Sequence, residues 1–161
     1  MMKLFGRTKT KIYTITSCVS GTVVPMEEIA DDVFRDGILG FCVGIEPDDG
    51  KIYAPADGVV TQVSETSHAI GIKTDYGAEI LIHAGIDTVQ MMGEGFSPKT
   101  SEGDRVAVGQ LLLEFDPGKV REAGYGTTVI TAVTNSGQFG DVMRASSGKT
   151  AVGEAIVQIR K

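Results

Sequence analysis

The sequence predicts an all-β domain, a compact antiparallel β-sandwich or barrel with only short helical turns. Glycine accounts for 21 of the 161 residues, which is about twice its usual ~7%. These glycines separate short runs that are rich in β-branched residues, as expected for many short strands joined by tight turns. Helical periodicity is weak, and the alternation of strands and helices that builds a parallel sheet is missing.

Each expected strand is an apolar or alternating run bounded by turn residues. We expect strands at about 12–18, 21–25, 39–46, 51–54, 58–64, 68–74, 79–84, 105–107, 110–115, 128–134 and 154–159. Short helical turns are expected at 27–35 and near 117–122. Residues 1–12 are expected to form a short flexible N-terminal tail, followed by a single domain over 13–161, a length that one domain accommodates.

Two segments indicate a duplicated architecture. TSCVSGTVVPM (16–26) aligns with YAPADGVVTQV (53–63), each having a glycine and then a valine two positions later, although such punctuation recurs in many β proteins. In EGDRVAVGQLLLEFD (102–116), glycine turns bracket very short strands. This resembles β-hammerhead modules, a group that includes lipoyl and biotinyl carrier domains and some zinc peptidases. We therefore expect a hammerhead-like, duplicated hybrid motif.

Composition and charge exclude several classes of function. The formal net charge is −6, and no long basic run is present, which argues against a nucleic-acid partner. No apolar run approaches the length of a membrane span or of a signal-peptide core. Cys18 and Cys42 have neither metal-site nor disulfide spacing, so we expect buried free thiols in a cytoplasmic protein without stable membrane insertion.

The only two histidines fall in one predicted hairpin. The runs SHAIGIKT (67–74) and AEILIHAG (78–85) flank a turn signal, DYG. If Tyr76 and Gly77 form a two-residue loop, Ile70 faces His83, and His68 lies diagonal to His83 on the same face. This register therefore predicts a pair of imidazoles, and it depends on the assignment of the turn.

Two kinds of chemistry are open to such a pair. Catalytic zinc usually takes three protein ligands, and although Asp87 follows His83 at the HxxxD spacing of lysostaphin-type peptidases, the HxH pair of those enzymes is absent. The other option is covalent catalysis. A histidine with an ordinary pKa is mostly neutral at pH 7, so its ring nitrogen can attack a phosphoryl group without a general base. A second imidazole could then donate a hydrogen bond to that group.

Both histidines belong to a longer series of motifs that resembles one protein family. The string HAIG (68–71), EILIHAGIDTV (79–89), GEGF (93–96) and EGDRV (102–106) resembles the glucose-class IIA component, or enzyme IIA, of the bacterial phosphoenolpyruvate-dependent sugar phosphotransferase system. The resemblance extends over about 13–161 and implies a compact antiparallel β-sandwich. It implies that His83 accepts a phosphoryl group, that His68 is needed for onward transfer, and that Thr66 orients the second ring.

The resemblance also implies partners. The donor would be the histidine-containing phosphocarrier protein and the acceptor a cysteine of the sugar-specific IIB/IIC permease, with a covalent phosphohistidine, no metal and no cofactor. An apolar docking patch would comprise Phe34, Ile38, Leu39, Val63, Ile70, Leu81 and Val89, with Asp31 and Asp87 at its edge facing arginines of the phosphocarrier protein.

Departures and alternatives accompany this interpretation. Gly40-Phe41-Cys42 stands where the family often has Gly-Asp-Gly, which affects the local turn and the docking rim. The alternative function is a regulatory binding module whose phosphorylation state controls transporters or kinases. A lipoate or biotin carrier is remote, because the turn that bears such a group is absent. The identity of the sugar is not encoded in this domain.

Overall fold

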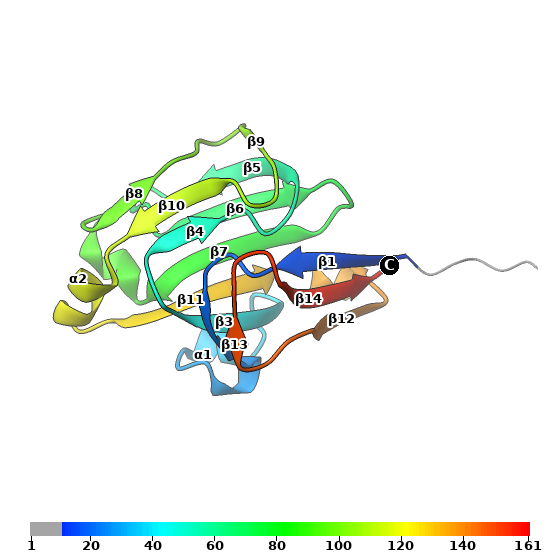
Figure 1. Ribbon diagram of the computed structural model, residues 1–161, viewed down its shortest axis with the longest axis horizontal. Helices are drawn as coiled ribbons and strands as arrows, with labels where there is room; N and C mark the ends of the chain where they lie inside the picture. Colours follow the sequence, from blue (N-terminus) through cyan, green and yellow to red (C-terminus); the bar gives the residue numbers. More distant parts are fainter. Residues whose placement is uncertain (1–10) are drawn as a thin grey trace, which may run out of the picture.

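Residues 11–161, which the computed structural model describes, fold into strands joined by tight turns and five short helical segments (Figure 1). The strands are β1 (Ile12–Thr16), β2 (Gly21–Val24), β3 (Phe41–Pro47), β4 (Lys51–Tyr53), β5 (Gly58–Val63), β6 (Ala69–Thr74), β7 (Glu79–Ile86), β8 (Phe96–Pro98), β9 (Arg105–Val106), β10 (Leu111–Phe115), β11 (Gly126–Val133), β12 (Asp141–Arg144), β13 (Lys149–Thr150) and β14 (Ala155–Arg160). The helices are α1 (Asp32–Arg35) and α2 (Pro117–Glu122), with 3-10 turns η1 (Met26–Glu28), η2 (Thr88–Met91) and η3 (Ser136–Gln138).

The strands form one large sheet and two small ones. The large sheet has eight strands in the order β13-β2-β3-β11-β7-β6-β5-β9, and the small sheets are β1-β14-β12 and β4-β10-β8. Every strand pair in these sheets is antiparallel. Within residues 11–161 the outermost strands β13 and β9 of the large sheet each pair with one neighbour only. The sheet is therefore open, and the predicted all-β sandwich is confirmed in its sandwich form rather than as a closed barrel.

The hydrophobic core lies between the large sheet and the two small sheets, which cover one of its faces side by side (Figure 1). Ile72 and Ile82 of the large sheet and Ile159 and Leu113 of the small sheets belong to this core and are at most 1% exposed. A second, smaller cluster covers the opposite face of the large sheet, where Phe34 of α1 packs with strand residues. The large sheet thus has an inner face and an outer face that is only partly covered.

The order of the sheets shows that the fold is duplicated. From one end the large sheet runs β13-β2-β3-β11, and from the other end it runs β9-β5-β6-β7. Each series begins with a two-residue strand, continues with two paired strands of which the first follows a small-sheet strand in the sequence, and ends with a long central strand. Gly21 and Gly58, the glycines that align in the sequence repeat, begin the equivalent strands β2 and β5. In both, a Cβ atom would collide with a backbone carbonyl of the adjacent strand. These two positions therefore require glycine for the same reason, which agrees with the predicted duplicated motif.

Most predicted strands are present in the structure. Strands β8, β12 and β13 were not expected; they have three, four and two residues, too few to show alternation. The predicted tail 1–12 lies outside the described residues up to position 10, and Ile12 already belongs to β1. Among residues 11–161 no helix is long and apolar enough to cross a membrane.

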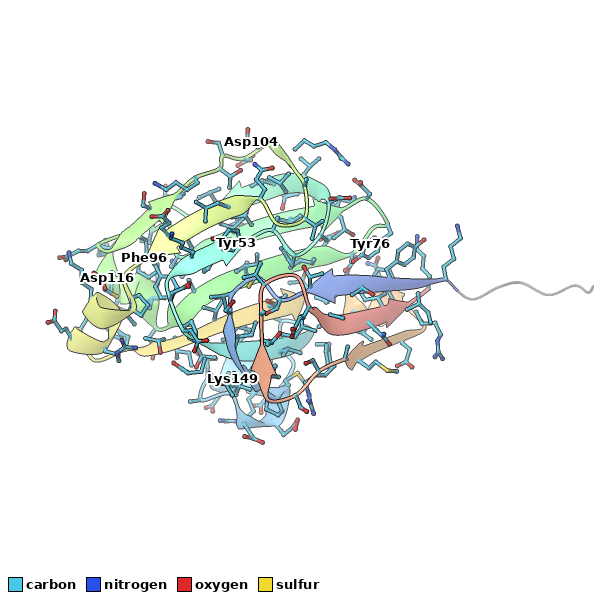
Figure 2. All side chains as sticks on the ribbon, in the orientation of Figure 1. Tyr53, Tyr76, Phe96, Asp104, Asp116 and Lys149 are labelled. Atoms are coloured by element: carbon cyan, nitrogen blue, oxygen red, sulfur yellow. The ribbon has the colours of Figure 1, made fainter. Side chains whose placement is uncertain are left out.

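Tyr76 lies at the end of the sandwich away from α2 (Figure 2). Tyr76, at the tip of the β6–β7 hairpin, stacks on Tyr13 of β1 with 4.2 Å between ring centroids. This contact joins the hairpin tip to the small sheet above it. The base of the same hairpin, at the other end of β7, carries the two histidines.

Candidate functional site

The two histidines meet on the outer face of the large sheet. His83 lies in β7, paired with Ile130 of β11 on one side and Ala69 of β6 on the other. His68 directly precedes β6. Their ring centroids are 4.7 Å apart and the rings are edge to face, at 82°. The predicted imidazole pair is therefore present.

The register that predicted this pair is wrong by one residue. Thr74, not Asp75, pairs with Ala78, because the Thr74 N–H donates to the Ala78 carbonyl and Gly77 N–H donates back to the Thr74 carbonyl. Gly77 has φ +97°, so the loop is a three-residue turn that ends in a left-handed glycine. Ile70 consequently pairs with Ile82 rather than His83. Residue 70 thus faces the inner core and not the histidines.

The histidines meet because the chain leaves the strand just before β6. Ser67 adopts φ +62°, a conformation that is uncommon outside glycine and that turns the chain at this point. His68 keeps one ladder contact, since its carbonyl accepts a hydrogen bond of 2.8 Å from the Ala84 N–H. The backbone of His68 is thereby fixed to β7 while its side chain escapes the strict alternation of the strand.

A backbone carbonyl sets the tautomer of His83. Its Nδ1 lies 2.7 Å from the carbonyl oxygen of Gly85. A carbonyl oxygen only accepts, so Nδ1 carries the proton and the lone pair of the neutral ring is on Nε2. No group among residues 11–161 hydrogen-bonds to Nε2. The geometry therefore presents Nε2 as the nucleophilic atom.

Hydroxyl groups hold the ring of His68. Thr66 Oγ1 lies 2.8 Å from His68 Nδ1, and Ser64 Oγ lies 3.4 Å from the same atom. Ser64 Oγ also accepts from the Ala69 N–H at 3.1 Å, which leaves its own proton free to donate. A hydroxyl that donates to Nδ1 leaves the proton of His68 on Nε2, where it can serve as a donor. Thr66 thus lies where the family resemblance places it.

The surroundings of both rings favour their neutral forms. Burial, followed by the neighbouring His83, lowers the pKa of His68 to about 4, against an opposing contribution from the backbone of Thr66. Burial also lowers the pKa of His83, while the Gly85 hydrogen bond and the carboxylates of Asp31 and Asp87 oppose that shift. These opposing groups favour positive charge on His83. The site therefore keeps the lone pair available and stabilises a ring that becomes cationic.

The apolar surroundings of His83 differ in part from the predicted docking patch. Ile38 and Val89 are 68% and 44% exposed, and Leu39 and Leu81 are half-buried against the outer cluster. A partner can reach all four.

Three members of the predicted patch lie elsewhere. Ile70 has no exposed surface, and Val63, which pairs with it, packs against the inner core. The assignment of Ile70 to a docking surface is therefore wrong, and Val63 does not lie on the histidine face. Phe34 is 5% exposed, with its ring centroid 5.1 Å from that of His83, so it forms a wall of the site.

The acidic residues lie at two edges of the site. Asp31 caps α1, accepting hydrogen bonds from Val33 N and Phe34 N, and this fixes the short helix that carries Phe34. Asp87 is exposed and adopts φ +62° at the start of η2. In the segment that departs from the family pattern, Cys42 is buried and its thiol donates to the Phe34 carbonyl. Cys42 thus supports the wall of the site.

Sequence reasoning missed two contacts in the site. Ser64 contacts the ring of His68, and the only sequence signal was a hydroxyl residue two positions before Thr66. Thr88 is fully buried beside Gly85 near the end of β7, and a polar residue two positions after the strand is the available signal. In residues 11–161 no group of three or more His, Cys, Asp or Glu side chains is arranged to hold a metal ion.

Comparisons with known proteins show the family to which the chain belongs. Residues 13–139 match the family described as phosphoenolpyruvate-dependent sugar phosphotransferase system, EIIA 1. The glucose-specific EIIA component of Bacillus cereus is 42% identical over 154 residues, which cover 95% of this chain and 90% of that protein. The glucose permease IIA of Mycoplasma capricolum has the same fold, with a TM-score of 0.81 and 26% identity over 92% of this chain and 96% of that one.

Other relatives are longer than this chain. The beta-glucoside-specific EIIBCA component of Halalkalibacterium halodurans is 38% identical over 164 residues, which cover 96% of this chain but 26% of that protein. A similar component of Dickeya chrysanthemi is 41% identical, with 23% of its length covered. The chain thus spans about a quarter of these relatives. On the matches to the family and to whole EIIA proteins, the chain belongs to the glucose-type EIIA family of the phosphoenolpyruvate-dependent sugar phosphotransferase system.

Proposed function

We propose that this chain is a phosphoryl carrier in which His83 accepts the group from the histidine-containing phosphocarrier protein and passes it to a cysteine of a sugar-specific IIB domain. The observation that supports this most directly is the fixed tautomer of His83. Its Nδ1 donates to the Gly85 carbonyl, so in the neutral ring the lone pair that can attack phosphorus is on Nε2.

The proposed transfer needs only bond exchange at phosphorus. The lone pair of His83 Nε2 forms the new N–P bond, while the N–P bond of the donor phosphohistidine breaks and its electron pair returns to the donor ring. The proton on Nδ1 stays in place, so the ring of His83 becomes cationic. The Gly85 carbonyl and the carboxylates of Asp31 and Asp87, which favour the charged ring, stabilise this product.

His68 would assist the transfer of the phosphoryl group from His83 to the acceptor. Its ring lies edge to face with His83, and a hydroxyl donating to its Nδ1 leaves an Nε2 proton that can hydrogen-bond a phosphoryl oxygen. When a cysteine thiolate attacks phosphorus, an S–P bond forms and the electron pair of the N–P bond returns to His83 Nε2. The chemistry uses a covalent phosphohistidine as its intermediate and calls for no metal or other cofactor in the carrier.

The surface around His83 supports docking of two partners in turn. Ile38, which follows α1, and Val89, in η2, are exposed apolar residues, and the carboxylates of Asp31 and Asp87 act on the His83 ring. A basic, partly apolar partner surface would fit this arrangement. The EIIBCA names of longer relatives join an A part with B and C parts, which supports a IIB/IIC permease as the acceptor. The free thiols of Cys18 and Cys42 are compatible with a cytoplasmic location.

The experiment is phosphoryl transfer from phosphoenolpyruvate through enzyme I and the phosphocarrier protein, followed by intact mass and peptide mapping under alkaline conditions. We expect an acid-labile phosphoryl group on His83 that is lost in His83→Ala. The His68→Ala variant is expected to accept the group but not to pass it to IIB. Failure of the wild-type protein to take up the group, or its appearance on another residue, would contradict the proposal.

A further inference from the structure

The carbonyl that sets the tautomer of His83 belongs to a residue with unusual freedom. Gly85 has φ +89°, a region that glycine enters readily but does not prefer over others. Its conformation determines where its carbonyl oxygen points, and that oxygen accepts from His83 Nδ1. Something other than the glycine itself must therefore hold the Gly85 carbonyl in place.

Thr88 contacts this turn through both branches of its side chain. Its hydroxyl donates a hydrogen bond of 2.7 Å to the Ala84 carbonyl, which fixes the peptide plane between Ala84 and Gly85. Its methyl group occupies the space beside Gly85, where a Cβ atom would collide with Thr88 Cγ2. Thr88 is 0% exposed, so both contacts form in a dry, packed environment, where a hydrogen bond is strong and costly to lose.

The residue that Thr88 holds also connects the two histidines. The Ala84 N–H donates to the carbonyl of His68 at 2.8 Å, and the Ala84 carbonyl accepts from Thr88. A buried hydroxyl after the strand is thus linked through a single residue, Ala84, to the backbone of His68. Asp87, immediately before Thr88, adopts φ +62°, a conformation that persists in a non-glycine residue when its surroundings hold it.

We propose that Thr88 is a positioning residue for the phosphoryl transfer: its hydroxyl and methyl groups hold the Ala84–Gly85 turn so that the Gly85 carbonyl keeps the proton of His83 on Nδ1. This inference rests on the proposed carrier function. Thr88 contacts neither the phosphoryl group nor the ring of His83, and it acts through Gly85. Loosening the turn would let the proton move to Nε2, which removes the nucleophilic lone pair from the atom that faces the partner.

The test combines Thr88→Val, which removes the hydroxyl but keeps the shape, with Thr88→Ser, which keeps the hydroxyl. The first measurement is the tautomer of unphosphorylated His83 from the ¹⁵N shifts of its ring between pH 5 and pH 8, about the range in which an ordinary histidine titrates. We expect a mixture of tautomers in Thr88→Val and a mainly Nδ1-protonated ring in Thr88→Ser and the wild type. The second measurement is the rate of phosphoryl uptake, which should fall about tenfold in Thr88→Val, as for one lost hydrogen bond, and recover in Thr88→Ser.

The matched control is Thr74→Val at the other end of the same hairpin. Thr74 is also buried, and its hydroxyl accepts from the Ala78 N–H at 2.9 Å. This variant should lose stability while keeping the His83 tautomer and the uptake rate. If the Thr88→Val protein does not fold, Thr88→Ala, which removes both contacts with a smaller side chain, provides the same measurements.

The positioning role is overturned if His83 in Thr88→Val keeps the wild-type tautomer, whether or not stability and rate fall. It is also overturned if the uptake rate in Thr88→Val equals that of the wild type. The tautomer is measured without any phosphoryl donor. A wild-type protein that takes up no phosphoryl group therefore contradicts the carrier function, while a tautomer change in Thr88→Val would still support the control of the ring by Thr88.

Discussion

At the scale of single residues, the site consists of one neutral nucleophile and one neutral companion, each held through Nδ1. His83 Nδ1 donates to a backbone carbonyl, whereas His68 Nδ1 faces hydroxyl groups that can donate. His83 Nδ1 therefore carries a proton, whereas His68 Nδ1 can accept one from a hydroxyl, with the ring proton of His68 then on Nε2. This difference fits the division of labour proposed for them, in which one Nε2 attacks and the other Nε2–H donates.

The pKa of His68 makes the stability of the protein depend on pH. Because the pKa in the folded state is about 4 and in the unfolded state about 6.5, the unfolded chain binds more protons between these values. The free energy of unfolding should be highest above about pH 6.5 and should fall as the pH drops toward 4. The protonation of His68 in the unfolded chain should account for on the order of 2–3 kcal/mol of that fall. Denaturant titrations of the wild type and His68→Gln at pH 7, 5.5 and 4 measure this decline in the free energy of unfolding.

The carboxylates titrate alike in the wild type and in His68→Gln. The difference between the two proteins therefore isolates the contribution of His68 to the pH dependence. His68→Gln should show a shallower decline in the free energy of unfolding between pH 6.5 and pH 4. Identical declines in the two proteins would show that His68 is not buried in its neutral form.

At the scale of elements, the sequence predicts long strands and misses details that depend on turns. The run AEILIHAG has enough β-branched and aliphatic residues for β7 to be evident, whereas β13 has two residues and β8 ends in Pro98. The register error arose at Asp75-Tyr76-Gly77, where a two-residue and a three-residue loop are both compatible with the letters. The two histidines still meet, because the left-handed backbone of Ser67 turns the chain just before β6. That backbone conformation is set by the folded surroundings and is not apparent from the sequence.

The prediction of the docking residues also depends on the strand register. An isoleucine on the inner face and one on the outer face look alike in sequence, so Ile70 was assigned to the surface and is buried. Ile38 lies between α1 and β3 and is exposed. Which face a strand residue occupies follows from the register, and a shift by one residue exchanges the faces. The identity of the histidines was therefore more predictable than the surface around them.

The end of β7 gives a prediction about glycine. At Gly85, with φ +89°, a Cβ would collide with Thr88 and lie 2.9 Å from the Gly126 carbonyl oxygen. Gly77 in the hairpin loop has φ +97° but open space around it. Gly77→Ala should therefore cost only the left-handed backbone penalty of about 1–2 kcal/mol, and Gly85→Ala about 1–3 kcal/mol more through overpacking.

Chemical denaturation of both glycine variants measures this difference in the free energy of unfolding. The Gly85→Ala variant should also lose phosphoryl uptake, while Gly77→Ala keeps it. Equal losses of stability in the two variants would mean that the turn around Gly85 is not tightly packed.

At the scale of the whole molecule, a duplicated sandwich carries both histidines in one half, while Phe34 and Asp31 reach the site from the other half. His83 lies in the long central strand of one half, and its neighbour across the centre of the sheet is Ile130 of the equivalent strand β11. The small sheets cover the inner face and leave the outer face for α1 and for partners. Under the proposed function, two partners would dock in succession on this outer face.

The exposed apolar residues near the site should act in docking and not in folding. Ile38→Ser should raise the concentration of phosphocarrier protein needed for half-maximal uptake several-fold, since the lost contact area corresponds to about 1–2 kcal/mol, while the melting temperature changes little. Val108→Ser, an exposed residue in the turn after β9, is the matched control and should leave transfer unchanged. Steady-state transfer assays with both variants test this, and equal effects would place docking elsewhere.

Under the proposed function, Nε2 of His83 is the atom that carries the phosphoryl group. Long-range ¹H–¹⁵N correlation spectra of the phosphorylated wild-type protein test it most directly, because they identify the substituted ring nitrogen. We predict phosphorus on Nε2 of His83 and a proton on Nδ1, hydrogen-bonded to Gly85 as in the free protein. Phosphorylation of Nδ1, or of any residue other than His83, would contradict the account.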